Sequence, residues 1–87
     1  MNERIDDAIE RSKKYVDFIK IPGGHKTKIW KVFSDTSGDI IGIIRWHSPW
    51  RHYCFFPNAE TVYSDGCLLN IGNFILEANE KYARRNK

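Results

Sequence analysis

Three residues near the middle of the chain could do chemistry together: His47, His52 and Cys54. Imidazole nitrogens and a thiolate are zinc ligands, and a Cys–His pair can act as an activated nucleophile. Structural zinc sites usually present paired ligands at short, recurrent spacings, and His-x4-His-x-Cys is a weak match even with Cys67 added. The sequence supplies neither an orienting group nor an oxyanion hole for a nucleophile. We therefore expect no catalytic site, metal or cofactor, and a metal-binding protein stays a remote alternative.

The most distinctive segment runs from Arg45 to Tyr53 and reads Arg-Trp-His-Ser-Pro-Trp-Arg-His-Tyr. Indole and imidazole rings can stack on nucleic-acid bases while arginines contact phosphates, as on single-strand binding surfaces. Two other interpretations stay open. Tryptophans on either side of a hairpin loop can simply pin the hairpin, and aromatic and arginine side chains are favoured anchors of protein interfaces.

The net charge of +3 comes entirely from one stretch of the chain. Residues 21–57 hold five basic and two acidic side chains, whereas residues 1–20 and 58–87 are each neutral. All three tryptophans and all three histidines lie in the same stretch. Such a basic, aromatic surface suits nucleic acid, although a charge of +3 is also ordinary for a soluble protein. The candidate binding residues are Lys28, Lys31, Arg45, Trp46, Trp50, Arg51 and Tyr53, with Lys26 as a further phosphate contact.

Helical spacing of apolar residues predicts a helix at each end of the chain. The stripe that runs from Ile5 to Ile19 indicates an amphipathic helix over about 3–20, which Pro22-Gly23-Gly24 ends. A second stripe indicates a helix over about 66–84, with Asp65 as its N-cap.

Between these helices, runs of β-branched and aromatic residues predict an antiparallel sheet. The expected strands cover about residues 28–34, 40–46 and 50–56, and Thr61-Val62-Tyr63 could add a short edge strand. The sequence thus predicts one α+β domain over residues 1–87, a two-layer α-β-β-β-α fold. Both helices would cover one face of a three-stranded antiparallel sheet, which would leave the other face at least partly exposed.

Two registers are open for the hairpin between the last two strands. A three-residue loop pairs Trp46 with Trp50, and a four-residue loop pairs Arg45 with Trp50. We favour the four-residue loop because it separates Arg45 from Arg51 and sets Arg45 opposite an aromatic ring. The choice matters because a slip of one residue moves every side chain of a strand to the other face. The favoured register places on one face Ile40, Gly42, Ile44, Trp46, Arg51, Tyr53 and Phe55.

The pattern Trp30-x-Val32, Gly42-x-Ile44-x-Trp46 and Trp50-Arg51-x-Tyr53-x-Phe55-x-Pro57 resembles a group of small uncharacterised bacterial and phage-borne proteins. The resemblance covers about residues 28–80 and implies a compact accessory protein without an assigned activity. The order of elements also loosely resembles the double-stranded RNA-binding domain, a family that binds duplex RNA partly through a basic start of its last helix. In this chain the helix begins Asp65-Gly66-Cys67-Leu68-Leu69, without a cluster of lysines. We therefore assign none of the family's RNA-binding residues to this chain.

Composition narrows the compartment and the partners. Two cysteines in a chain with 41% hydrophobic residues indicate reduced thiols in a core rather than a disulfide scaffold. The charged N-terminus does not resemble a secretory signal, and no run approaches the ~20 apolar residues of a membrane span. We expect a cytoplasmic, non-enzymatic binding module without a membrane partner, possessing a surface that favours nucleic acid. The alternative is a protein-interaction module, of phage or prophage type or a homodimer, that uses the same aromatic hairpin.

Overall fold

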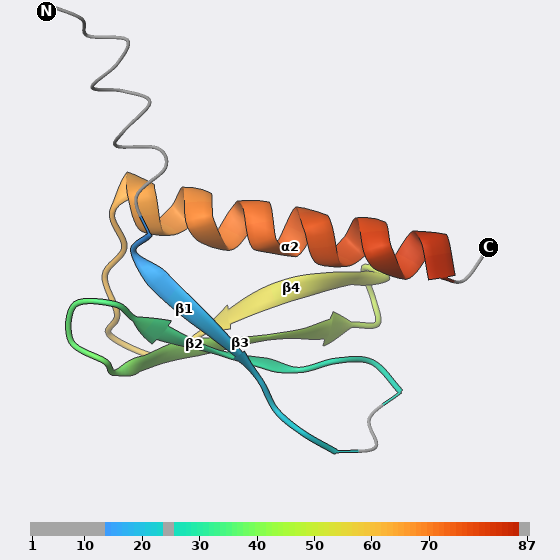
Figure 1. The fold of residues 1–87 in the computed structure, drawn as a ribbon, viewed down its shortest axis with the longest axis horizontal. Helices are drawn as coiled ribbons and strands as arrows, with labels where there is room; N and C mark the ends of the chain where they lie inside the picture. Colours follow the sequence, from blue (N-terminus) through green and yellow to red (C-terminus); the bar gives the residue numbers. More distant parts are fainter. Residues whose placement is uncertain (1–13, 24–25, 86–87) are drawn as a thin grey trace, which may run out of the picture.

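The computed structural model describes residues 14–23 and 26–85 of the chain. Four strands follow one another as an antiparallel meander in which sequence neighbours are sheet neighbours. One helix follows the sheet and lies across one of its faces (Figure 1). The elements are β1 (Val16–Lys20), β2 (Trp30–Ser34), β3 (Ile40–His47), β4 (His52–Pro57) and α2 (Asp65–Arg85).

The first strand corrects the prediction of a helix over residues 3–20. Residues 16–20 form β1, which pairs with β2 so that Val16 lies opposite Ser34 and Lys20 opposite Trp30; residues 3–13 lie outside the described part. Val16 is 1% exposed and Ile19 is 55% exposed, because the two side chains point to opposite faces of the sheet. The prediction of an α+β fold with an antiparallel sheet is therefore confirmed. The predicted numbers of three strands and two helices are not confirmed, because the sheet has four strands and the described residues contain one helix.

The remaining predicted elements are displaced by two residues or fewer at each end. Strands expected over 28–34, 40–46 and 50–56 are observed as β2, β3 and β4, and the helix expected over 66–84 is α2. No strand forms at 61–63 in this described stretch, so that edge strand is wrong. The helix begins one residue earlier than expected. Ser64, rather than Asp65, caps it, because the Ser64 hydroxyl accepts a hydrogen bond from the Cys67 N–H at 3.3 Å.

The hairpin between β3 and β4 adopts neither of the two expected registers. His47 pairs with His52, and the loop between them has four residues, 48–51. The pairs are displaced by two residues on each strand from the favoured register. Because this displacement is even, the strand residues keep their predicted faces. The face toward α2 carries Gly42, Ile44, Trp46, Tyr53 and Phe55. Arg51 lies in the loop, and Ile40 lies beyond a bulge that interrupts the β2–β3 pairing.

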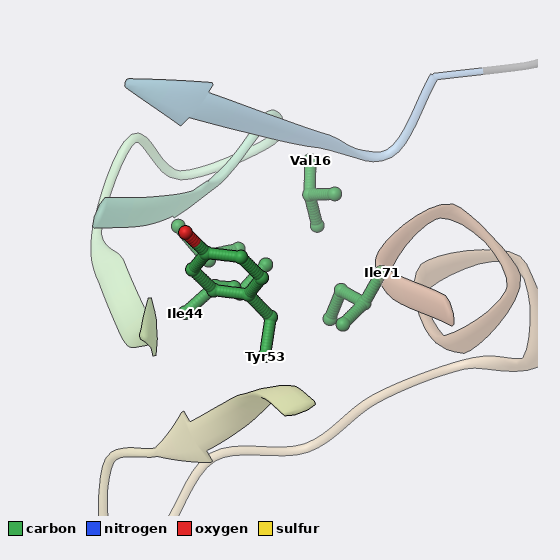
Figure 2. Packing of buried hydrophobic residues seen from close by; sticks show 5 residues of the cluster. Val16, Ile44, Tyr53 and Ile71 are labelled. Atoms are coloured by element: carbon green, nitrogen blue, oxygen red, sulfur yellow. The ribbon is translucent and has the colours of Figure 1, made fainter. Parts of the chain in front are cut away.

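Every described element contributes one side chain to the buried core. Val16, Val32, Ile44, Tyr53 and Ile71 come from β1, β2, β3, β4 and α2 in turn, and none is more than 4% exposed. Figure 2 shows these side chains meeting between the sheet and the helix. Aromatic contacts extend the core, since the Phe18 and Phe74 rings stack at 4.0 Å and Trp30 meets Phe74 edge-on at 5.0 Å. All five buried side chains lie on one side of the sheet, so the other side carries no second core within the described residues.

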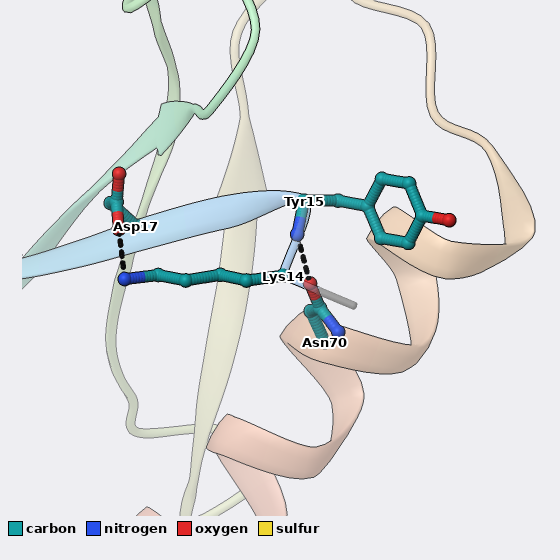
Figure 3. Close-up of polar contacts among 4 residues, drawn as sticks. All are labelled: Lys14, Tyr15, Asp17 and Asn70. Carbon is teal, nitrogen blue, oxygen red and sulfur yellow. Dashed lines mark hydrogen bonds and ion pairs between the residues drawn. The ribbon is translucent and has the colours of Figure 1, made fainter. Parts of the chain in front are cut away.

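Two asparagines of α2 fix the helix to opposite edges of the sheet. Asn70 accepts a hydrogen bond at 2.7 Å from the N–H of Tyr15, next to edge strand β1 (Figure 3). Asn79 accepts one at 2.7 Å from the N–H of Tyr53 in the other edge strand, β4, and its amide donates to the Tyr53 carbonyl at 3.4 Å. Asn79 thus satisfies both backbone polar groups that Tyr53 presents at the free edge of β4.

An ion pair between Lys14 and Asp17 lies next to the hydrogen bond between Tyr15 and Asn70. Lys14 Nζ contacts the Asp17 carboxylate (Figure 3), and this hydrogen bond raises the pKa of Lys14. Both side chains are exposed, so the pair contributes little to stability.

The Asn79 clamp generates a stability prediction. Asn79→Ala leaves the partly buried Tyr53 N–H without its acceptor, and we expect a loss of about 1–3 kcal/mol in the free energy of unfolding. Asn73→Ala is the matched control, because Asn73 is exposed on the same helix and its loss should change stability by less than about 0.5 kcal/mol. Urea denaturation followed by circular dichroism measures both. Equal effects of the two changes would show that the clamp does not hold the helix.

Gly42 and Gly72 make a second matched pair. A Cβ at Gly42 would lie 2.5 Å from the Phe56 carbonyl oxygen and 2.6 Å from the Phe55 ring, whereas a Cβ at Gly72 meets nothing within 4 Å. Gly42→Ala should therefore destabilise the domain by about 1–3 kcal/mol through overpacking. Gly72→Ala should stabilise it by about 0.5–1 kcal/mol through helix propensity. Thermal unfolding measures both, and a stabilised Gly42→Ala protein would contradict the observed β3–β4 packing.

Candidate functional site

A cleft of about 660 Å³ lies between the β1–β2 connection and the C-terminal half of α2. The connection supplies residues 26–28, the sheet face toward α2 supplies two aromatic side chains, and the helix supplies the opposite wall. The lining residues are Lys26, Thr27, Lys28, Trp46, Tyr53, Ala78, Lys81, Tyr82 and Arg85.

The charge of this cleft has one sign. Four of its lining residues are basic and none is acidic. Within residues 14–23 and 26–85, no carboxylate forms an ion pair with Lys26, Lys28 or Arg85, and Lys81 has only a loose contact with Glu77 at 3.9 Å. Both side chains of that contact are more than 60% exposed, so it holds Lys81 weakly. The cleft therefore presents several cations to a ligand.

Three aromatic rings form the floor of the cleft. The Trp46 and Tyr82 rings lie 4.4 Å apart at an angle of 35°, and Tyr53 meets them edge-on at 5.3 and 6.1 Å. Tyr53 is 4% exposed, so its ring belongs to the core and does not offer a face for stacking. Its hydroxyl accepts a hydrogen bond from the Lys28 N–H at 3.1 Å, which places Lys28 at the rim. Trp46 and Tyr82 are half-buried and form the accessible part of the floor.

The opposite face of the sheet carries a second cluster of rings and cations. The Arg45 guanidinium lies 3.8 Å above the centre of the Phe56 ring, and the His47 ring meets both Phe56 and Trp50 edge-on. Trp50 is 69% exposed in the hairpin loop. We expected Arg45 to lie against an aromatic ring, but that ring is Phe56 rather than Trp50, since the strand partner of Arg45 is Cys54. None of the four side chains of this cluster, Arg45, His47, Trp50 and Phe56, lines the cleft or the other two hollows described for the chain.

The predicted binding residues are thus divided between the two faces. Lys28, Trp46 and Tyr53 line the cleft, whereas Lys31 and Arg45 lie on the opposite sheet face with Trp50 beside them. Arg51 lies in the hairpin loop. Lys81, Tyr82 and Arg85 also line the cleft but were not predicted as binding residues. The available signal was the spacing of four between Lys81 and Arg85, which places two cations on one helix face.

The residues considered for metal binding do not converge. His52 Nδ1 hydrogen-bonds the Trp50 carbonyl at 3.1 Å, the Cys54 thiol lies 3.8 Å from the His52 carbonyl, and His47 packs between aromatic rings. Among the described residues, no three His, Cys, Asp or Glu side chains are grouped so that they could hold a metal ion. Cys54 and Cys67 are free, half-buried thiols.

Comparison with known proteins adds no relative. No family model matches the chain, and no curated protein and no solved structure is similar enough to count as a match. The resemblance to small bacterial and phage-borne proteins stays a prediction. The described part of the chain contains no helix with the length and apolarity needed to cross a membrane.

Proposed function

We propose that this chain is a non-enzymatic binding module with nucleic acid as its ligand, held in the cleft between the β1–β2 connection and α2. One observation carries the proposal: four basic side chains from two distant segments surround an aromatic floor, and no acidic side chain lines the cleft. Phosphates are the anions that such a ring of cations would neutralise, and the bases of a single strand are the flat groups that the rings would accept.

Helix electrostatics explain only part of this charge. The C-terminal end of a helix has a negative partial charge, so Arg85 in the last turn would stabilise α2 without any ligand. Lys26 and Lys28 lie on the β1–β2 connection, for which this explanation does not hold. The Tyr53 hydroxyl nevertheless fixes the backbone of Lys28 beside the cleft. Two independent segments therefore bring positive charge to one place, which favours an anionic ligand over a purely structural role.

Salt dependence and two groups of variants test the proposal. Contacts from four cations to a single strand should give a log–log salt slope of about −3, which is roughly a 50-fold loss of affinity between 50 and 200 mM salt. Lys28→Ala and Lys81→Ala should each weaken binding of a fluorescent thymidine octamer several-fold and reduce the slope by about 0.7. Fluorescence anisotropy measures both quantities.

The matched control is Lys31→Ala, since Lys31 is an exposed lysine on the opposite face of the sheet. This variant should bind the octamer with nearly unchanged affinity. If Lys31→Ala weakens binding and the cleft variants do not, the nucleic acid lies on the other face. Absence of binding at low salt would end the nucleic-acid proposal.

A second candidate is self-association through the hairpin, which the exposure of Trp50 favours. Trp50 is 69% exposed, and among the described aromatic rings its ring contacts only that of His47. Large exposed aromatic side chains are frequent anchors of protein interfaces. The partner in this case would be a second copy of the chain.

Self-association makes a separate prediction about Trp50→Ala. The variant should stay folded, because the ring contributes little to the core, but should dissociate at least about tenfold more readily than the wild-type dimer. Sedimentation equilibrium measures the dissociation constant and circular dichroism checks the fold. A wild-type protein that is monomeric at high micromolar concentration would exclude this candidate.

A further inference from the structure

A second hollow adjoins the cleft and shares part of its aromatic lining. It has a volume of about 260 Å³ and is lined by Trp46, Arg51, His52, Asn79, Tyr82 and Ala83. Trp46 and Tyr82 line both hollows, so the two hollows share this pair of rings. This ring pair, which we call the ridge, therefore adjoins both the basic cleft and the hollow that Arg51 lines.

Charge and aromatic surface continue along this path. The second hollow is lined by one arginine and, like the cleft, by no acidic side chain in the described part of the chain. Its floor includes Asn79, which is already held by the backbone of Tyr53, so the hollow is built on a fixed part of the fold. Cations in both hollows, next to a half-buried ring pair, match the alternation of phosphate and base along one nucleic-acid strand.

The backbone of Arg51 is a separate observation on the same residue. Its φ is 55°, in the left-handed region that glycine adopts without strain and that costs an arginine conformational energy. The Trp50 and Arg51 N–H groups both donate to the His47 carbonyl, at 3.1 and 2.9 Å, so the loop geometry holds Arg51 in this conformation. Glycine would suit the turn better, so the turn gives no reason for an arginine, whereas the hollow does.

We propose that the two hollows are successive subsites for a single nucleic-acid strand. Phosphates bind Lys28 and Lys81 in the cleft and Arg51 in the second hollow, and a base between them stacks on the ridge of Trp46 and Tyr82. This inference rests on the proposed function and extends it. It selects single strands over duplex, because a base paired and stacked in a duplex has no face free for the ridge.

Arg51→Gly is the decisive variant, because it removes the guanidinium and relieves the left-handed strain at the same time. We therefore expect the variant to stay folded, and circular dichroism checks that a loss of binding does not come from unfolding. We expect Arg51→Gly to bind a thymidine octamer about five- to tenfold more weakly than the wild type at 50 mM salt, measured by fluorescence anisotropy. Arg45→Gln, which removes one guanidinium on the opposite face, is the charge-matched control and should change the affinity less than about twofold.

Two further ligands test the stacking step. An abasic octamer with the same phosphates should bind about tenfold more weakly than the thymidine octamer, because it has no base for the ridge. A duplex of the same length should bind more weakly than the single strand. Tyr82→Leu should abolish the preference for thymidine over the abasic strand, whereas Tyr82→Phe should retain it.

The outcomes separate this inference from the proposed function. If Lys81→Ala weakens octamer binding and Arg51→Gly does not, the cleft binds nucleic acid but the second subsite is wrong. Equal losses for Arg51→Gly and Arg45→Gln would mean that net charge alone is responsible, and would also overturn the second subsite. If the wild type binds neither the octamer nor the duplex, both proposals fail.

Discussion

The position of α2 on the sheet depends on two asparagine contacts, and the rest of the structure follows from that position. Asn70 and Asn79 accept N–H groups from backbone at opposite edges of the sheet, both at 2.7 Å. A helix attached at β1 and at β4 must cross the face of the sheet, which places Ile71 over the four buried residues of the strands. The core it covers is small. Hydrogen bonds at the two edges therefore help to hold the helix on the sheet, which in larger domains a more extensive apolar contact does.

The same crossing decides where the cleft lies. Asn79 holds the C-terminal half of α2 on β4, so Tyr82, one turn later, reaches Trp46 on β3. Lys81 and Arg85 then lie across the cleft from the β1–β2 connection. The hydrogen bond from the Lys28 N–H to the Tyr53 hydroxyl holds this connection beside the cleft. A single residue, Tyr53, thus contributes to the core through its ring, to the helix contact through its backbone and to the cleft through its hydroxyl. The site is a continuation of the core rather than an appendage on it.

Patterns within single elements predicted most of the local structure. Runs of β-branched and aromatic residues predicted β2 and β3. The grouping of Ile44, Trp46 and Tyr53 on one face is observed as expected, because the error in register was an even number of residues. The strand at Val16–Lys20 was misread as part of a helix, because Tyr15, Val16 and Ile19 continue the helical stripe. In the strand, Val16 and Phe18 instead point to the core, and Ile19 points to the opposite face. This segment is a strand because it pairs with β2, which is distant from it in the sequence. A local pattern of residues does not show whether β2 has an unpaired edge to which the segment can bind.

The division of the basic, aromatic stretch was the least predictable feature. Strand alternation sends Arg45 to one face and Trp46 to the other, and this follows once the register is known. The addition of Lys81 and Arg85 to the cleft depends instead on the direction in which α2 crosses the sheet, and that direction is set by tertiary hydrogen bonds. The distribution of charge along the chain therefore predicted a binding surface within residues 21–57. The folded chain instead combines that stretch with a helix that looked neutral.

Rigidity follows from the way the aromatic floor is supported. Trp46 is in contact with Tyr53, and Tyr53 is in contact with Trp30, which packs on Phe74 of α2. The rings that would meet a ligand are thus held by rings that form the core, so little side-chain freedom remains to be lost on binding. The lysines are different, because they are exposed at the rim and keep their freedom until a ligand arrives. Pre-ordered rings with adaptable cations suit a ligand whose flat groups recur in a fixed shape while its backbone varies, which is the character of a nucleic-acid single strand.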